Sequence, residues 1–283
     1  MKNIHVIGIG LIGGSFALDL KAFYPQAKIV GIDNCEAHLE KARELGIIDK
    51  SAELEDVAGS DLVIIAVPVD AGIGLLKKVL DQIGDHTLVI DAGSTKEKIC
   101  TEVATHPKRR NFLAAHPISG TEFSGPEAAV SELYRNKTMI ICEVEKTAFK
   151  LQEKALEIFR HLGMRIRYMD AKSHDKHIAY VSHLSHISSF MLGKTVLEKE
   201  RNERDIFDMA GSGFASTVRL AKSSPAMWSP IFQQNRENIL ETLTEYISNL
   251  NQFKSLMEEN NFEEVYREME KTNHIKSILN GIN

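Results

Sequence analysis

The sequence predicts an α/β fold: a doubly wound, mostly parallel sheet over residues 1–170, followed by an all-α domain over residues 171–283. Two observations support this prediction. Through residues 1–170, short apolar runs alternate with helical stretches, which is the pattern of repeated strand–helix units in a parallel sheet. After Asp170, runs of β-branched residues become scarce and apolar residues recur at helical spacing. We therefore expect two domains with a boundary near residue 170.

In the first domain, short apolar runs predict the strands and the amphipathic stretches between them predict the helices. The expected strands cover residues 4–7, 28–32, 62–67, 87–90, 112–115, 138–142 and 165–169. The expected helices cover residues 15–20, 36–45, 70–83 and 147–162. Gly46 suits the C-cap of the second of these helices, and Pro68 is expected to end the third strand.

The second domain is expected to contain helices at residues 173–200, 203–209, 214–222, 226–249 and 262–280, with Pro225 suited to a helix start. A long apolar stripe along these helices predicts burial against a second copy of the chain, and hence a homodimer. The alternative is that the stripe packs only within its own chain. The stripe consists of Ile231, Ile239, Leu243, Tyr246, Ile247 and Leu250.

A glycine-rich turn joins the first expected strand to the first helix, and a second strand then ends on Asp33. This is the dinucleotide-binding fingerprint of Rossmann-type domains in its usual setting of strand, turn, helix, strand and acid. Gly8 allows the tight turn, Gly10 lets a pyrophosphate approach the backbone, and Gly13 lets the helix lie close to the strand. The bare glycine pattern could also be an ordinary strand-to-helix turn, but the flanking elements favour a nucleotide site.

Asp33 selects the cofactor. Its carboxylate can accept hydrogen bonds from the ribose hydroxyls and would repel a 2′-phosphate, and no arginine occurs among the next three residues, Asn-Cys-Glu. We therefore expect NAD rather than NADP. The expected cofactor-binding residues are Gly8, Gly10, Leu11, Ile12, Gly13, Asp33, Val67 and Pro68.

Bulk composition excludes several classes of protein. The formal net charge of −5 offers no general attraction to nucleic acid. The longest strongly apolar run, residues 62–67, is far too short to span a bilayer, and no cleavable export signal is evident at the N-terminus. The three cysteines form no CxxC pair, which suits free thiols in a reducing compartment. We therefore expect a cytoplasmic protein.

Two polar residues follow strands at the edge where ligands bind in a doubly wound fold. His116 opens a glycine-containing loop after one strand, where it could serve as a base or hydrogen-bond acceptor. It could equally be a structural loop histidine. Ser94 follows the neighbouring strand and could orient the ring of His116, or act as the N-cap of a helix that starts near Thr95.

The second domain adds further candidate residues. His183 and His186 are three apart and share one helix face, and His174 and His177 lie upstream. Four such histidines could suggest a metal site, but none is expected, because no cysteine contributes and no HExxH motif is present. A polar helix face that lines a cleft is the preferred interpretation. Arg219 could bind a carboxylate with both of its terminal nitrogens, or form a surface or intersubunit ion pair.

Five segments carry a resemblance to a known family. They are GIGLIGGS at 8–15, DAGSTK at 91–96, HPISGTEFSG at 116–125, SHLSH at 182–186 and GSGFASTVR at 211–219, and Ser-Pro-Ala-Met-Trp follows the last of them at 224–228. HPISGTEFSG is the most specific of the five, because few other Rossmann dehydrogenases have it. Together, and over nearly the whole chain, these segments resemble the prephenate/arogenate dehydrogenase family.

The resemblance implies NAD-dependent oxidative decarboxylation of prephenate to 4-hydroxyphenylpyruvate, a step of tyrosine biosynthesis within aromatic amino acid biosynthesis. It implies that His116 takes the hydroxyl proton of the substrate and that Ser94 hydrogen-bonds His116. Arg219 would bind a substrate carboxylate, and Glu122 would help to gate the pocket. The residues implied in substrate binding are Arg219, His186, His183, Glu122, Ser119, Gly120 and Thr121.

The chain departs from the family pattern at Ser216, where related sequences often carry an acid, so a gating network that uses that acid is in doubt. Several alternatives remain open at this point. The substrate could be arogenate, which would give tyrosine directly. The chain could be another dehydrogenase with a Rossmann and a helical domain, of the β-hydroxyacid or pyrroline carboxylate reductase type. It could also be a regulatory module that senses NAD without catalysis.

Overall fold

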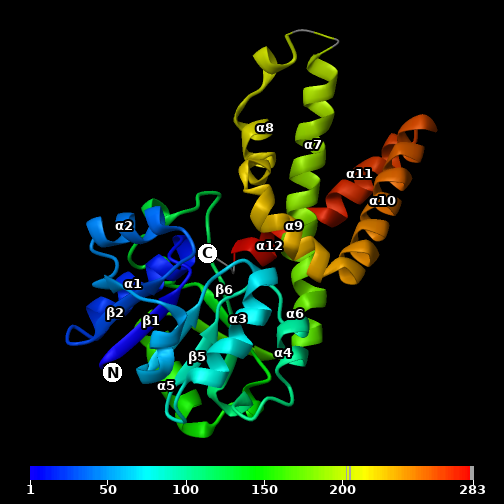
Figure 1. The fold of residues 1–283 in the computed structure, drawn as a ribbon. Coiled ribbons are helices and arrows are strands. Elements are labelled where there is room, and N and C mark those ends of the chain that lie inside the picture. Colours follow the sequence, from blue (N-terminus) through cyan, green and yellow to red (C-terminus); the bar gives the residue numbers. More distant parts are fainter. Residues whose placement is uncertain (202, 204, 281–283) are drawn as a thin grey trace. The chain divides into compact units, whose positions relative to one another are not determined.

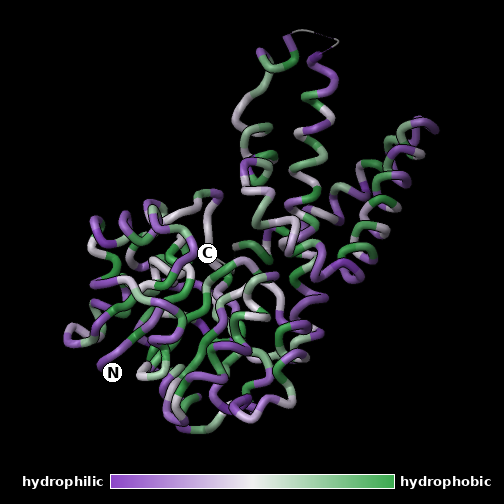
Figure 2. Tube along the Cα trace, in the orientation of Figure 1, coloured by the Kyte–Doolittle hydropathy of each residue, from purple (hydrophilic) through white to green (hydrophobic). Residues whose placement is uncertain are grey.

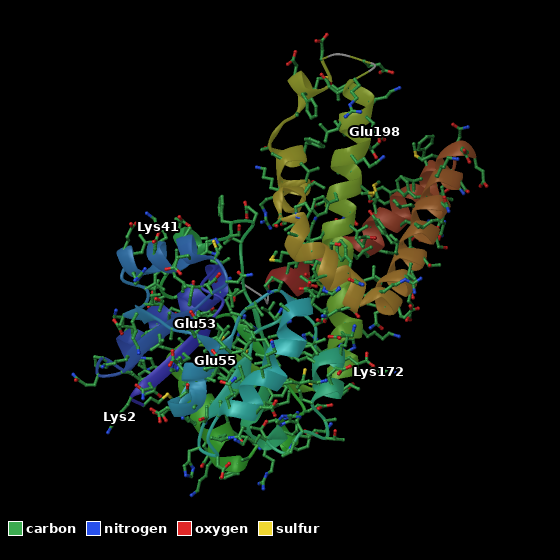
Figure 3. All side chains as sticks on the ribbon, viewed as in Figure 1. Lys2, Lys41, Glu53, Glu55, Lys172 and Glu198 are labelled. Atoms are coloured by element: carbon green, nitrogen blue, oxygen red, sulfur yellow. The ribbon has the colours of Figure 1, made fainter. Side chains whose placement is uncertain are left out.

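The structure is a computed structural model that describes residues 1–201, 203 and 205–280. It divides into two compact units, Met1–Arg236 and Glu237–Asn283, which we describe separately. Charged side chains are spread over the surface, as the exposed Lys2, Lys172 and Glu198 show in Figure 3. In the described part of the chain, none of the helices has the length and apolarity needed to cross a bilayer.

Eight strands of the described chain form one sheet in the order β3-β2-β1-β4-β5-β6-β7-β8 (Figure 1). Every neighbouring pair is parallel except β6 and β7. The predicted doubly wound, mostly parallel sheet is therefore confirmed; the short β3 and the antiparallel pair were not predicted. The strands are β1 (Asn3–Ile7), β2 (Lys28–Ile32), β3 (Lys50–Ser51), β4 (Leu62–Ile65), β5 (Leu88–Asp91), β6 (Phe112–Ile118), β7 (Thr138–Cys142) and β8 (Arg165–Met169).

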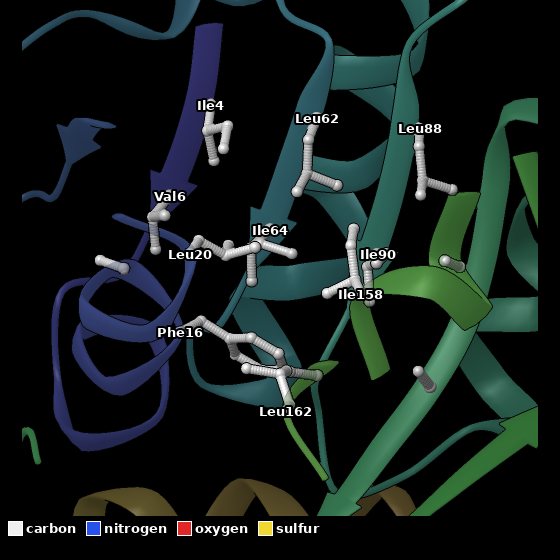
Figure 4. Packing of buried hydrophobic residues seen from close by; sticks show 14 of the residues in the cluster. Ile4, Val6, Phe16, Leu20, Leu62, Ile64, Leu88, Ile90, Ile158 and Leu162 are labelled. Atoms are coloured by element: carbon white, nitrogen blue, oxygen red, sulfur yellow. The ribbon is translucent and has the colours of Figure 1, made fainter. Parts of the chain in front are cut away.

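Helices cover both faces of this sheet. The first face is covered by α1, α2 and α5, whose buried residues cluster with Ile4, Leu62 and Leu88 of the strands (Figure 4). The second face is covered by α3 and α4, which cluster with alternate strand residues such as Val63 and Val89. Alternate residues of a strand point to opposite faces, so both faces of the central strands are buried. The bounds are α1 (Leu11–Phe23), α2 (Glu36–Glu44), α3 (Val69–Gln82), α4 (Glu97–Glu102) and α5 (Phe149–His161).

A helical segment completes the first unit. The expected helix over 173–200 is present as α6 and α7, joined by one π-helical turn. The expected helix over 203–209 is only a 3₁₀ turn at its end, with residues 202 and 204 outside the described residues. The bounds are α6 (Ala171–Ile178), the π turn (Ala179–His183), α7 (Leu184–Glu200), α8 (Ser212–Thr217) and α9 (Pro225–Gln234). The 3₁₀ turns are Leu54–Gly59, Arg109–Asn111, Pro126–Ala128, Val144–Lys146, Phe207–Met209 and Arg219–Lys222.

The prediction of a single helix over 226–249 was wrong, because α9 ends before Asn235 and a new helix, α10 (Arg236–Glu258), begins after it. The side-chain amide of Asn235 donates to the backbone oxygen of Asp175, and its backbone leaves the helical region with φ −104° and ψ 26°. A short polar side chain that bonds elsewhere in the fold thus marks the end of a helix. The expected helix over 214–222 is likewise divided, into α8 and a 3₁₀ turn.

The second unit continues from α10 into α11 (Phe262–Thr272) and α12 (Ile275–Asn280), so the helix expected over 262–280 is also interrupted. Large apolar side chains of these helices are exposed. Figure 2 colours the tube by the hydropathy of each residue, with hydrophobic residues in green. Within the expected stripe, Ile247 and Leu250 are exposed. Ile231, by contrast, is buried in a cluster with Val69 and Trp228 of its own unit.

Candidate active site

The glycine turn has the geometry that a dinucleotide needs. Gly8 has φ +87°, and a Cβ there would lie 2.4 Å from the carbonyl oxygen of Ala66. A Cβ on Gly13 would lie 1.9 Å from the carbonyl oxygen of Gly8, so only glycine lets α1 start so close to β1. A Cβ on Gly10 would meet no atom nearer than the backbone nitrogen of Gly125, at 4.0 Å. The N-terminus of α1, which has no side-chain cap, can therefore receive a pyrophosphate.

The remaining predicted cofactor residues surround this turn. One Asp33 oxygen accepts from the backbone N–H of Ile9 at 2.9 Å, and the other accepts from that of Cys35 at 3.0 Å. These bonds hold the carboxylate at the end of β2 and leave lone pairs for ribose hydroxyls. Val67 lies in contact range of Gly8, and Pro68 is the N-cap residue of α3. Leu11 and Ile12 open α1.

His116 lies near the end of β6 at the carboxyl edge of the sheet and is half-buried. Its Nδ1 is 2.8 Å from Nε2 of His174. Burial, followed by the charges of His174, Lys96 and His183, holds the pKa of His116 well below its ordinary value. The imidazole is therefore neutral at neutral pH, which is the state that can accept a proton.

Ser94 lies half-buried in the turn after β5, at the same edge. The hydrogen bonds of the described residues do not connect it to His116. The alternative that Ser94 caps the next helix was wrong, because α4 begins only at Glu97. The start of α4 is capped instead by Asp175, whose two carboxylate oxygens accept from the backbone N–H groups of Lys96 at 2.7 Å and Glu97 at 2.9 Å.

A buried ion pair fixes the strand ends beside His116. Lys96 is fully buried, and its ammonium group contacts the carboxylate of Asp91 and donates to the carbonyl oxygen of Ala115 at 2.8 Å. Asp91 also accepts from the backbone N–H of Gly93 at 2.9 Å. Because Ala115 immediately precedes His116, this lysine ties the end of β5 to the segment that positions the histidine.

Asn235 determines the protonation pattern of His183. The backbone oxygen of Asp175 can only accept, so the Asn235 atom 2.7 Å from it is the amide nitrogen. The same nitrogen is 3.1 Å from Nδ1 of His183, which must then be the acceptor. Burial lowers the pKa of His183 to about 4, so the neutral ring carries its proton on Nε2.

Two N–H donors of this region are buried and have no partner among the described residues. They are Nε2 of His183 and Nε1 of Trp228. The ring of Trp228 also stacks on His186, with centroids 3.5 Å apart, and Nδ1 of His186 is 3.0 Å from the carbonyl oxygen of Ser182. Buried donors without partners are rare in folded proteins, and here they point to a ligand with acceptor oxygens.

Arg219 forms an ion pair with Glu122, with Nη1 and Oε2 3.0 Å apart. Glu122 belongs to the loop after His116, in which Gly120 has φ +152° and the hydroxyl of Thr121 accepts from the backbone N–H of Phe123 at 3.2 Å. The charge of Arg219 also contributes to lowering the pKa of His186, after burial, the main cause. Ser119 of the same loop has a buried hydroxyl without a partner in the described chain.

The four histidines considered for a metal do not form a metal cluster. His177 is exposed, whereas His174 is buried between His116 and Asp175. Across the described residues, no group of three His, Cys, Asp or Glu side chains is arranged to hold a metal ion. No role for Asp175 or Asn235 was predicted from the sequence. The only local signal was the adjacency of His174 and Asp175, which does not reveal contacts to distant segments.

Comparison with known proteins identifies the family. Residues 16–168 match the family model described as the nucleotide-binding domain of prephenate dehydrogenase, and residues 170–271 match its dimerization domain. The chain belongs to the prephenate dehydrogenase family. A relative from Bacillus subtilis, named prephenate dehydrogenase, is 32% identical over 94% of this chain and 73% of its own length.

Other members of the family support the same assignment. A cyclohexadienyl dehydrogenase from Zymomonas mobilis is 28% identical over 90% of this chain and 88% of its own length. The crystal structure of prephenate dehydrogenase from A. aeolicus, in complex with hydroxyphenyl propionate and NAD⁺, matches with a TM-score of 0.90. The two chains are 31% identical, and the match covers 99% of this chain and 98% of the other.

Replacing the buried lysine should destabilise this family member strongly. We expect Lys96→Met to cost about 3–5 kcal/mol of unfolding free energy, because the Asp91 carboxylate stays buried without its counter-ion. Urea denaturation measures the loss. The matched control is the double variant with Asp91→Asn, which removes both charges and should recover a large part of it. Equal losses in the single and double variants would contradict the role assigned to the ion pair.

Proposed function

We propose that this chain catalyses the NAD-dependent oxidative decarboxylation of prephenate to 4-hydroxyphenylpyruvate. The observation that carries the proposal is the neutral, half-buried His116 at the edge of the sheet that also holds the glycine turn and Asp33. Family membership supports this reaction, and this arrangement offers a candidate base and a dinucleotide site for it. When bound, NAD would supply the acceptor for the hydride that leaves C4 of the substrate.

His116 is proposed to remove the proton of the substrate's 4-hydroxyl group. Its Nδ1 is occupied by His174, so the proton would be received at Nε2. Loss of the ring carboxylate as CO₂ returns an electron pair to the ring, which becomes aromatic, and the oxygen on C4 takes the proton back from His116 to give the phenol. Ser94 is proposed to assist at this centre, because it follows β5 at the edge where β6 presents His116.

The substrate's carboxylates are proposed to bind to the helical segment of the first unit. Arg219 is the proposed clamp, and its guanidinium must exchange the carboxylate of Glu122 for that of the substrate. The unpartnered N–H groups of His183 and Trp228 suit a second acceptor group. His186, stacked on Trp228, is proposed to lie beside the substrate, and the loop residues Ser119, Gly120 and Thr121 to border it.

We also propose a homodimer formed through the C-terminal helices, with a domain boundary near residue 170. The family model over residues 170–271 is described as a dimerization domain. Exposed apolar residues on α10 and α11, among them Phe253 and Phe262, and an apolar groove on α7 that includes Leu197 provide surfaces for it. A cytoplasmic location is proposed because the three cysteines are unpaired.

Steady-state kinetics with both candidate substrates and both cofactors tests the activity. We expect turnover of prephenate with NAD, and weaker turnover with NADP because Asp33 would repel the 2′-phosphate. The measurement is the substrate-dependent appearance of NADH. Exclusive turnover of arogenate would replace the proposed substrate, and binding of NADH without turnover of either compound would indicate a regulatory module instead.

The pH profile tests the proposed base. Activity should fall with decreasing pH as His116 becomes protonated, and the midpoint should lie below the ordinary histidine range because burial lowers the pKa of this ring. The dependence of log kcat/KM on pH gives the midpoint. A profile that is flat through the acid range, or one whose acid limb lies at or above the ordinary histidine pKa, would contradict the assignment.

Removing the clamp should affect binding more than chemistry. For Arg219→Ala we expect KM for prephenate to rise about 10- to 100-fold, the size of a lost charge-assisted hydrogen bond, with a smaller change in kcat. Arg135→Ala is the matched control, since Arg135 is an exposed arginine paired with Glu132. It should leave KM unchanged. An unchanged KM in Arg219→Ala would exclude the clamp.

A further inference from the structure

We infer that His174 and Asp175 are positioning residues that hold the proton of His116 on Nδ1 and thereby keep Nε2 as the proton acceptor. This inference rests on the function proposed above. Neither residue is expected to touch the substrate. They act through a chain of hydrogen bonds in which each partner has only one possible role.

The chain begins at the carboxylate of Asp175, which is buried. One oxygen accepts from the backbone N–H of Lys96 at 2.7 Å and lies 2.7 Å from Nδ1 of His174; the other accepts from the backbone N–H of Glu97. An ionised carboxylate can only accept hydrogen bonds. The hydrogen between Asp175 and His174 must therefore be on Nδ1 of His174.

His174 transmits this constraint to His116. Burial is the largest influence on its pKa, which lies below the ordinary value despite the opposing effect of Asp175. A neutral His174 with its proton on Nδ1 has a lone pair on Nε2. Nδ1 of His116 lies 2.8 Å from that lone pair and must donate to it. The proton of the neutral His116 ring is then on Nδ1, and Nε2 has the free lone pair.

The tautomer decides whether His116 can act as a base. A ring with its proton on Nε2 would present a donor to the substrate's hydroxyl group and could not receive its proton there. A carboxylate that fixes the tautomer of a catalytic histidine is a known arrangement in hydrolases, where its loss lowers turnover steeply. Here a second imidazole is placed between the carboxylate and the base.

Two substitutions of His174 separate this role from packing. In His174→Gln the side-chain amide oxygen can take the place of Nε2 and accept from Nδ1 of His116. In His174→Phe the ring volume is kept and the acceptor is lost. We expect His174→Phe to lower kcat about 10- to 1000-fold with KM for prephenate changed less than about threefold, and His174→Gln to stay within about fivefold of the wild type.

If His174 only filled space, kcat would fall less in His174→Phe than in His174→Gln, because phenylalanine fills the buried ring site better than glutamine. Thermal unfolding of both variants identifies any loss of fold. Wild-type kcat in His174→Phe would overturn the inference. Equal losses of kcat in the two variants would also overturn it.

Nitrogen-15 NMR of the ligand-free enzyme with labelled histidine tests the tautomer directly, with His116→Asn used to assign the resonances. We expect the proton on Nδ1 of His116 in the wild type and in His174→Gln. A wild-type spectrum with the proton on Nε2 would overturn the inference. Because this measurement needs no turnover, it decides the tautomer even if prephenate proves not to be the substrate, and it remains decisive if His174→Phe does not fold.

Discussion

The geometry of the site depends on the hydrogen bonds that the buried carboxylate of Asp175 accepts. It caps the N-terminus of α4 through two backbone N–H groups and binds His174, while the backbone oxygen of the same residue accepts from Asn235. One residue of α6 is thereby joined to the edge of the sheet, to the catalytic candidate His116 through His174, and to the break between α9 and α10. A carboxylate at a helix N-terminus is stabilised by the helix dipole as well as by its hydrogen bonds.

Much of the nucleotide-binding half could be predicted because its signals are local. Buried parallel strands appear as continuous apolar runs, and the glycine turn must fit a backbone conformation that few other residues adopt. Gly8 has a φ of +87°, which favours glycine locally, and a Cβ on Gly13 would meet the carbonyl oxygen of Gly8, five residues earlier. The position of His116 at the ligand-binding edge could be predicted from the strand and loop pattern around it, without knowledge of contacts to distant segments.

The helical half was predicted less well, because its decisive contacts join distant segments. Asn235 ends a helix through a hydrogen bond to Asp175, which lies 60 residues away in the sequence. The residues around Asn235 give no sign of that partner. His174 was assessed as a possible metal ligand from its spacing to other histidines, yet its partner is His116, 58 residues earlier. The antiparallel pairing of β7 with β6 could not be predicted from periodicity, because parallel and antiparallel strands buried in a sheet both appear in the sequence as short apolar runs.

The helices α6 and α7 are joined by a π-helical turn at Ala179–His183, which could not be predicted from the sequence. Each residue of an α-helix rotates the next by about 100°, so a single added or lost residue redirects every side chain that follows. The turn lies between His174 and Asp175 of α6 and His186 of α7, and His183 is its last residue. It therefore sets the angle between the side chains of α6 and those of α7. In evolution this segment should accept changes of residue type far more readily than changes of length.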